Sequence, residues 1–191
     1  AQITAPAAYL IPQGWWKVIE LLKLNEVIME KLSHDTAIVV EAYKIKDLKS
    51  AERAYEGHHG NSSIKVEKVK LTYAFRKGDY IVPVQQLQKR FLIEVLEPEA
   101  TDAYLAWNFF DAILVQKEGY SDYAYETYAA QYLSEHPELQ AELNRKRNVD
   151  TAFAANAAAQ LDFVFKSSPY YEKGHNLYPV FRLLSEVEQA P

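Results

Sequence analysis

Residues 63–75, SIKVEKVKLTYAF, show the alternation of apolar and polar side chains that is typical of a β-strand with one buried face. The apolar positions of the second half are Val69, Leu71, Tyr73 and Phe75. In the first half, Ile64 and Val66 have the opposite phase. Because successive side chains of a strand point to opposite faces, this change of phase predicts a bulge or a bend at Glu67–Lys68.

Other apolar segments in the first half of the chain predict further strands. Residues 35–45, DTAIVVEAYKI, are rich in β-branched side chains and predict a strand that crosses the sheet. AAYLIP at 7–12 and NEVIMEKL at 25–32 predict shorter strands, and QGWWKVIELLKL at 13–24 predicts an amphipathic helix between them. A turn with glycine and a short apolar segment, RKGDYIVP at 76–83, predict a hairpin with the preceding strand.

From residue 84 onward the apolar period lengthens from two residues to that of a helix. We expect helices at 84–96, 101–116, 122–135, 137–147 and 157–165, followed by an extended tail over 167–184. The helix at 101–116, which Thr101 or Asp102 could cap, is apolar on two sides and should be central and buried.

The order of these segments, strands first and helices afterwards, indicates an α+β fold. We expect a small, mostly antiparallel N-terminal sheet with one early helix, followed by a C-terminal helical half that packs on the sheet. The length suits a single domain over residues 1–191.

Composition excludes several kinds of protein. The net charge of −5 and the pI of about 5.6 argue against a nucleic-acid-binding surface. The absence of cysteine excludes disulfides, a thiol nucleophile and thiolate metal ligands. No apolar run approaches the ~18 residues of a membrane span. The sequence begins with alanine and shows no signal-peptide apolar segment, so we expect a processed chain or a part of a longer protein.

A polar segment with two glycines, residues 47–62, predicts a loop between two strands and contains the candidate metal ligands Glu56, His58 and His59. A loop could bring these side chains together around a zinc ion. However, none of the five histidines is followed by glutamate three residues later, and H-E-x-x-H is absent. Adjacent histidines on extended backbone also point to opposite faces. The alternative, a polar loop with one hydrogen-bonded histidine, is therefore favoured.

An acidic cluster surrounds Pro98 at the expected joint between two helices and comprises Glu97, Glu99 and Asp102. Two carboxyl groups could act as a general acid and a general base. Acidic residues before a helix more often cap it and interact with its dipole, which is the favoured interpretation. The patterns G-x-S-x-G, G-x-G-x-x-G and the P-loop are absent as well. The residues by themselves thus indicate no catalytic site.

Three tyrosines, Tyr125, Tyr128 and Tyr132, share one face of an expected helix. Their spacing would suit a platform on which a sugar or a peptide stacks. It would equally suit aromatic rings that pack against a neighbouring helix, and this second interpretation is favoured.

Several long segments resemble one protein family: AAYLIPQGWWKVIELLKL, YEGHH, FRKGDYIVP, RFLIEVLEPEATDAYLAWNFFDAILVQKEGYSDYAYE, AQLDFVF and SPYYEKGHNLYPVFRL. Together they are similar to the region that follows the peptidase domain in bacterial secreted zinc carboxypeptidases of the carboxypeptidase A-like superfamily. The resemblance implies that the zinc ligands and the catalytic glutamate of such a protein lie upstream, in a peptidase domain. It also implies export to the periplasm or the extracellular space. No catalytic residue and no zinc ligand is carried over to this chain.

We therefore expect a non-catalytic accessory domain that stabilises a zinc carboxypeptidase-like peptidase domain or shapes its substrate approach. The first alternative is an aromatic-rich module that binds cell-wall glycan or peptide. The second is an independent hydrolase that uses the loop with Glu56, His58 and His59.

Overall fold

The computed structural model describes residues 3–116 and 119–184. The contacts between residues divide the chain into two compact units, which we call unit 1 (Ala1–Val115 and Gly174–Pro191) and unit 2 (Gln116–Lys173). The described part of unit 1 contains a β-sheet, and that of unit 2 is helical. A single domain over residues 1–191 stays a prediction, because compactness alone does not test whether the units fold independently.

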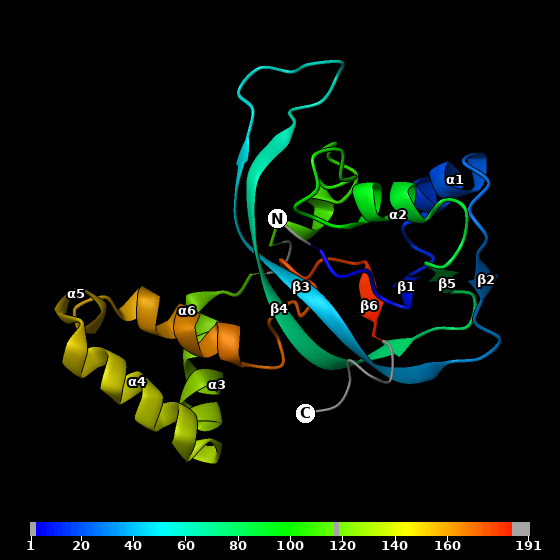
Figure 1. Cartoon of the computed structure of the whole chain (residues 1–191). Helices are drawn as coiled ribbons and strands as arrows, with labels where there is room; N and C mark the ends of the chain where they lie inside the picture. The colour runs from blue at the N-terminus through cyan, green and yellow to red at the C-terminus, as the bar shows by residue number, and fades with distance from the viewer. Residues whose placement is uncertain (1–2, 117–118, 185–191) are drawn as a thin grey trace. The chain divides into compact units, whose positions relative to one another are not determined.

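The sheet of unit 1 has six strands within the described residues, in the order β2-β5-β1-β6-β3-β4, and all neighbouring strands are antiparallel (Figure 1). The strands are β1 (Ala8–Ile11), β2 (Glu30–Lys31), β3 (Thr36–Ser50), β4 (Asn61–Phe75), β5 (Tyr80–Pro83) and β6 (Phe181–Leu183). The expected α+β class with an antiparallel sheet is confirmed.

The long hairpin of β3 and β4 changes its buried face part-way along its length. Glu67 and Lys68 pair in register with Lys44 and Tyr43, so of the predicted alternatives, a bulge or a bend, the bulge is not present at this position. The residues before it, Ile64 and Val66, pack in one core, whereas Val69, Leu71 and Tyr73 pack beside Phe75 in another. The register shifts lie nearer to the turn, between Ile45 and Asp47 and between Asp47 and Lys49.

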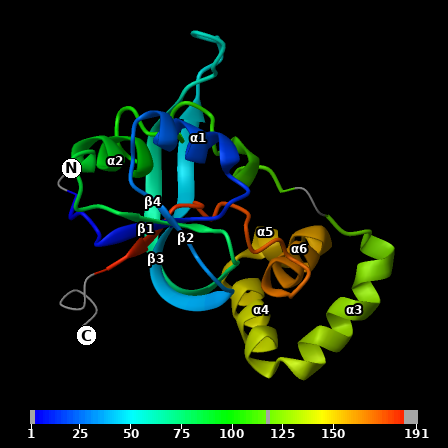
Figure 2. The ribbon, with the colours of Figure 1, turned by 90° about the vertical axis from the view of Figure 1, so that its right-hand side faces the viewer.

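The two cores of unit 1 lie on opposite faces of the sheet, because Tyr9 and Ile11 belong to one core and Leu10 between them belongs to the other. Helices α1 (Trp16–Leu24) and α2 (Lys89–Leu96) cover the first face and lie side by side (Figures 1 and 2). Their buried residues are Val18, Ile19 and Leu22 of α1 and Leu92, Val95 and Leu96 of α2. The early helix is therefore confirmed.

Several side chains of residues 101–116 are buried as expected, but the segment does not form the expected helix. They form turns and one short 3-10 helix, η1 (Asp111–Ile113), and neither Thr101 nor Asp102 caps a helix. Tyr104, Leu105 and Phe110 nevertheless lie in the first core. Asn108 has a φ of 66°, which reverses the chain and is incompatible with a continuous helix. The apolar residues on two sides thus indicated burial and not the backbone conformation.

Strand β5 does not form a hairpin with β4, because it pairs with β1 and β2. Asp79, at the turn before β5, accepts hydrogen bonds from the backbone N–H groups of Gln13 and Arg76, at 2.9 and 2.8 Å. These bonds fasten the turn to the chain that follows β1, so β5 continues beside β1. The tail also differs from expectation, because its residues Phe181–Leu183 form β6 in the interior of the sheet.

Unit 2 comprises α3 (Asp122–Glu135), α4 (Pro137–Val149), α5 (Thr151–Ala154) and α6 (Ala157–Ser167) (Figure 2). Its core contains Tyr125, Ala129, Leu143, Val164 and Phe165. The local signals agree with these boundaries: Pro137 stands at the start of α4, and the side chains of Asp150 and Asn156 accept hydrogen bonds at the starts of α5 and α6. In the described part of the chain, no helix has the length and apolar character needed to cross a membrane.

Candidate functional site

The segment with the histidine pair forms the turn of the long hairpin. The loop is shorter than expected and covers residues 51–60, because β3 continues to Ser50 and β4 begins at Asn61. The backbones of Tyr55 and His58 exchange two hydrogen bonds of 2.9 Å. Glu56 and Gly57 between them have φ values of 49° and 80°. Positive φ at both central residues is characteristic of the type I′ turn, which suits the twist of a hairpin.

The two histidines have different contacts. The imidazole of His58 packs edge-on against the indole of Trp107, with ring centroids 5.6 Å apart, and also lies near Phe109. Nδ1 of His59 lies 2.8 Å from the carbonyl oxygen of Ala51, across the loop. His58 therefore fastens the hairpin to the segment around Trp107, and His59 closes the loop.

A group of amide and carboxylate side chains holds the base of this loop. The side-chain nitrogens of Asn61 and Asn108 each donate to the carboxylate of Asp111, at 2.8 and 2.9 Å. Asn108 also donates to the carbonyl oxygen of His59, and the backbone N–H of Asn61 donates to the carbonyl oxygen of Ala106. The loop thus faces residues 103–113 of its own unit.

The proposed ligands Glu56, His58 and His59 are not brought together as a metal site. Over residues 3–116 and 119–184, no group of three or more His, Cys, Asp or Glu side chains is arranged to hold a metal ion. The described residues therefore do not fit the zinc site of a metallopeptidase.

The acidic cluster around Pro98 is separated by the fold, because Glu99 and Asp102 are exposed whereas Glu97 is only 1% exposed. The hydroxyl groups of Tyr9 and Tyr43 each donate to one oxygen of the Glu97 carboxylate, and both bonds measure 2.7 Å. The three residues come from β1, β3 and the end of α2. Glu97 therefore connects elements that are distant in the sequence.

Arg182 of β6, which is 2% exposed, completes this buried network. Its Nε lies 3.1 Å from Glu97 Oε1, and its guanidinium also donates to the carboxylate of Glu41 and the carbonyl oxygen of Thr4. It lies over the ring of Tyr43 at 5.6 Å. Buried charges are stable only when they are paired and hydrogen-bonded in this way.

Burial shifts the pKa values of this network strongly. Removal from water raises the pKa of Glu97, and the hydrogen bonds from Tyr43 and Tyr9 oppose this shift. Burial, followed by the negative charge and the hydrogen bond of Glu97, raises the pKa of Tyr9 and Tyr43 well above that of a free phenol. Burial likewise raises the pKa of Tyr104 to about 12 and raises the pKa of Tyr178 well above its ordinary value.

The Glu97 network acts as a structural connection, because both carboxylate oxygens already accept hydrogen bonds and almost no surface of Glu97 is exposed. Arg182, Tyr9 and Tyr43 were not among the site residues predicted from the sequence. One signal was present: Arg182 is the only charged residue within the apolar segment YPVFRLL, at residues 178–184. A lone charge in a strand of this kind indicates a buried partner.

The tyrosines predicted on one helix face do form a cluster in unit 2. Tyr125 is buried and packs on Phe165, while Tyr128 and Tyr132 are half-buried and stack on each other, with ring centroids 5.7 Å apart. A cleft of about 360 Å³ opens beside this cluster. Among the described residues, its lining contains no charged side chain and comprises Gly119, Tyr120, Ser121, Ala124, Tyr125, Tyr128, Phe165 and Tyr170.

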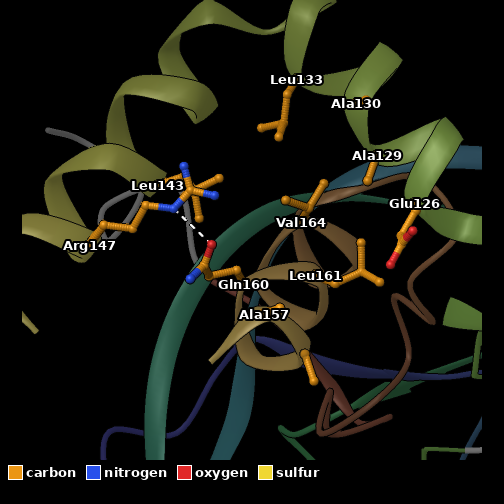
Figure 3. Close-up of a pocket in the computed structure, with 11 residues that line it drawn as sticks. Glu126, Ala129, Ala130, Leu133, Leu143, Arg147, Ala157, Gln160, Leu161 and Val164 are labelled. Carbon is orange, nitrogen blue, oxygen red and sulfur yellow. Dashed lines mark hydrogen bonds between the residues drawn. The ribbon is translucent and has the colours of Figure 1, made fainter. Parts of the chain in front are cut away.

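A second hollow in unit 2, which we call the unit 2 groove, lies among α3, α4 and α6 and has a volume of about 480 Å³ (Figure 3). Its lining is largely apolar and includes Leu133, Leu143, Leu161 and Val164. Several alanines leave the space open, and two charged side chains, Glu126 and Arg147, lie at its margins. This groove could not be predicted from the sequence, because its residues come from three separate helices.

Part of the chain is similar to known peptidases. Over 102 residues, or 53% of the chain, it is 28% identical to Carboxypeptidase 2 of Trichophyton tonsurans. The proteins of the same name from Trichophyton rubrum and Trichophyton equinum are 26% identical over the same length. The chain therefore contains a carboxypeptidase-related region.

The matched residues make up only 19% of each fungal protein, so the chain spans about a fifth of the length of these relatives. No protein-family model matches the chain, and no solved structure is significantly similar to it. The carboxypeptidase relation thus rests on a partial similarity in sequence.

Proposed function

We propose that this chain is a non-catalytic accessory domain of a larger carboxypeptidase-like protein. It would stabilise an upstream peptidase domain or shape the approach of the substrate to it. The observation that carries the proposal is the similarity of about half the chain to a small part of Carboxypeptidase 2. On this proposal the zinc ion, its ligands and the catalytic glutamate belong to the peptidase domain, and the protein is exported.

The contacts of the candidate catalytic groups support this proposal. Glu97 is enclosed by two tyrosines and Arg182, and His59 bonds within its own loop. His58 packs on Trp107. Each of these side chains therefore has a role in holding unit 1 together, which is what an accessory domain requires of them.

The test compares the chain alone with the complete protein. We expect the purified chain to release no C-terminal residue from peptides. In contrast, its presence should raise the melting temperature of the zinc-loaded peptidase domain, by roughly 2–4 °C for each kcal/mol of contact. Melting is measured by calorimetry with and without the chain, fused or added in trans.

Two results would decide against the accessory role. One is peptide hydrolysis by the chain alone that is lost in His58→Ala and retained in the control His34→Ala, which would favour the independent hydrolase. The other is a peptidase domain whose melting temperature and KM for long and short peptides are the same with and without the chain.

A second candidate function is the binding of a neutral ring, from cell-wall glycan or peptide, in the tyrosine cleft. The aromatic and, among the described residues, uncharged lining of the cleft favours the binding of a neutral ring, since sugar rings and aromatic rings stack on tyrosine. Tyr170 lines the cleft and is 60% exposed, whereas Tyr123 on α3 is 91% exposed and lies outside the lining.

Binding of N-acetylglucosamine oligosaccharides, followed by calorimetry, should weaken about two- to tenfold in Tyr170→Ala and stay unchanged in Tyr123→Ala. A loss of one stacked ring is worth roughly 0.5–1.5 kcal/mol, or up to about tenfold in affinity. Equal binding by both variants would show that the sugar does not occupy this cleft.

A further inference from the structure

The unit 2 groove carries opposite charges on opposite sides of an apolar floor. Figure 3 shows Arg147 of α4 on one side and Glu126 of α3 on the other, with Leu161 and Val164 of α6 between them. Its volume of about 480 Å³ falls within the range of roughly 300–1,000 Å³ that is usual for small-ligand sites.

Arg147 is held in place by neighbouring side chains. Its Nε donates to Gln160 Oε1 at 2.8 Å, and its Nη1 donates to Asn144 Oδ1 at 3.2 Å. Gln160 is fixed in turn, because its Nε2 donates to the carbonyl oxygens of Phe153 and Ala154. A guanidinium has five N–H donors, so these two bonds leave donors for a ligand. An oriented guanidinium loses less conformational entropy when it binds a carboxylate.

The apolar floor is built for aliphatic groups. Leu133, Leu143, Leu161 and Val164 contribute branched side chains, and the alanines at 129, 130, 157 and 158 leave room beside the helix backbones. A sugar or a phosphate would lose hydrogen bonds against such walls. An anion alone would also meet the negative charge of Glu126.

We propose that the unit 2 groove binds a short aliphatic peptide with free termini, whose carboxylate pairs with Arg147 and whose ammonium group pairs with Glu126. A free amino acid is a poorer fit, because its two charges lie on one carbon, whereas Arg147 and Glu126 lie on opposite sides of the groove. The proposal goes beyond the accessory role and concerns unit 2 alone, so it can fail or succeed independently of any peptidase domain.

The test uses the whole chain and the tripeptide leucyl-alanyl-leucine, with binding followed by calorimetry and by NMR shifts of the α6 amides. Acetylation of the N-terminus and amidation of the C-terminus each remove one ligand charge. We expect each change to weaken binding about three- to tenfold, as is usual for loss of one charged hydrogen bond at a partly exposed site.

Charge-removing variants assign each terminus to its partner. Arg147→Gln should weaken binding of the unblocked tripeptide as much as C-terminal amidation does. In this variant, amidation of the tripeptide should lower the affinity no further. Glu126→Gln should weaken binding as much as N-terminal acetylation does, and acetylation should lower the affinity of this variant no further. Arg147→Lys should bind the unblocked tripeptide more tightly than Arg147→Gln. Arg145→Gln and Glu142→Gln, on exposed positions of α4 outside the groove, serve as matched controls.

Three outcomes would overturn the proposal. The first is equal binding of free and blocked tripeptides, and the second is an equal effect of the control variants. The third is no binding at millimolar tripeptide by a chain that circular dichroism shows to be folded. If the tripeptide fails while a peptidase domain is still stabilised by the chain, the accessory role stands without this site.

Discussion

Replacement of Glu97 by alanine is expected to lower the unfolding free energy of unit 1 by about 3–5 kcal/mol. The substitution would leave the hydroxyl groups of Tyr9 and Tyr43 without their acceptor. It would also remove a carboxylate partner of the buried, positively charged Arg182. The removal of one partner from a buried charge is among the most destabilising changes that one substitution can make.

Urea unfolding near pH 7 measures this effect, and tryptophan fluorescence isolates unit 1 because Trp15, Trp16 and Trp107 all belong to it. Glu97→Gln keeps one acceptor oxygen and should cost less, about 1–3 kcal/mol. The exposed Glu99, two residues away, is the control, and Glu99→Ala should change stability by no more than about 0.5 kcal/mol. If Glu97→Ala were as mild as Glu99→Ala, the network would not hold unit 1 together.

The second large effect is a loss of stability in alkaline solution. Tyr9, Tyr43, Tyr104 and Tyr178 are buried, and the pKa of each is raised above the ordinary value of 10.0. Above pH 10 the unfolded chain loses these phenolic protons while the folded chain keeps them. The folded state then binds more protons, so stability falls as pH rises.

Each tyrosine contributes about 1.4 kcal/mol per pH unit between the unfolded pKa and its raised folded pKa. Four tyrosines together give a slope of roughly 5 kcal/mol per unit, and an ordinary domain of about 5–15 kcal/mol would unfold within ~1–3 units above pH 10. The stability that these protonated tyrosines contribute is fully present below pH 10. For Tyr104, whose pKa is raised to about 12, it is lost between pH 10 and 12.

Urea midpoints measured at several pH values would give this slope. Tyr104→Phe should reduce the slope by about 1.4 kcal/mol per pH unit, because one titrating phenol is removed. Tyr123→Phe, at a position 91% exposed, should leave it unchanged. A midpoint independent of pH between 10 and 12 would contradict the burial of these phenols.

The sequence predicted much of the sheet because strand signals are local. The alternation in residues 63–75 and the β-branched segment at 35–45 correspond to β4 and β3, and the period of residues 13–24 corresponds to α1. Pro137 at the first position of α4 and Asn156 as the N-cap of α6 are signals that depend on only a few neighbouring residues. The observed starts of these helices therefore lie close to the predicted ones.

The failures share one physical cause, namely that an apolar pattern shows which side chains are buried but not against what. The change of phase at Glu67–Lys68 reflects two cores on opposite faces of one ribbon, not a bulge. The buried side chains within residues 101–116 lie on turns that Asn108 and Asn61 stabilise, and not on a helix.

By itself, then, the sequence determined the α+β class, the strands at 35–45 and 63–75 and the helices at 122–135, 137–147 and 157–165. Only the tertiary structure decided that Glu97 meets Tyr9, 88 residues away, and Tyr43, 54 residues away, or that Glu126 and Arg147 face the same groove. Secondary structure follows from interactions among neighbours in the chain. The pairing of charges and hydroxyl groups depends instead on which distant segments pack together, and on the water that this packing removes.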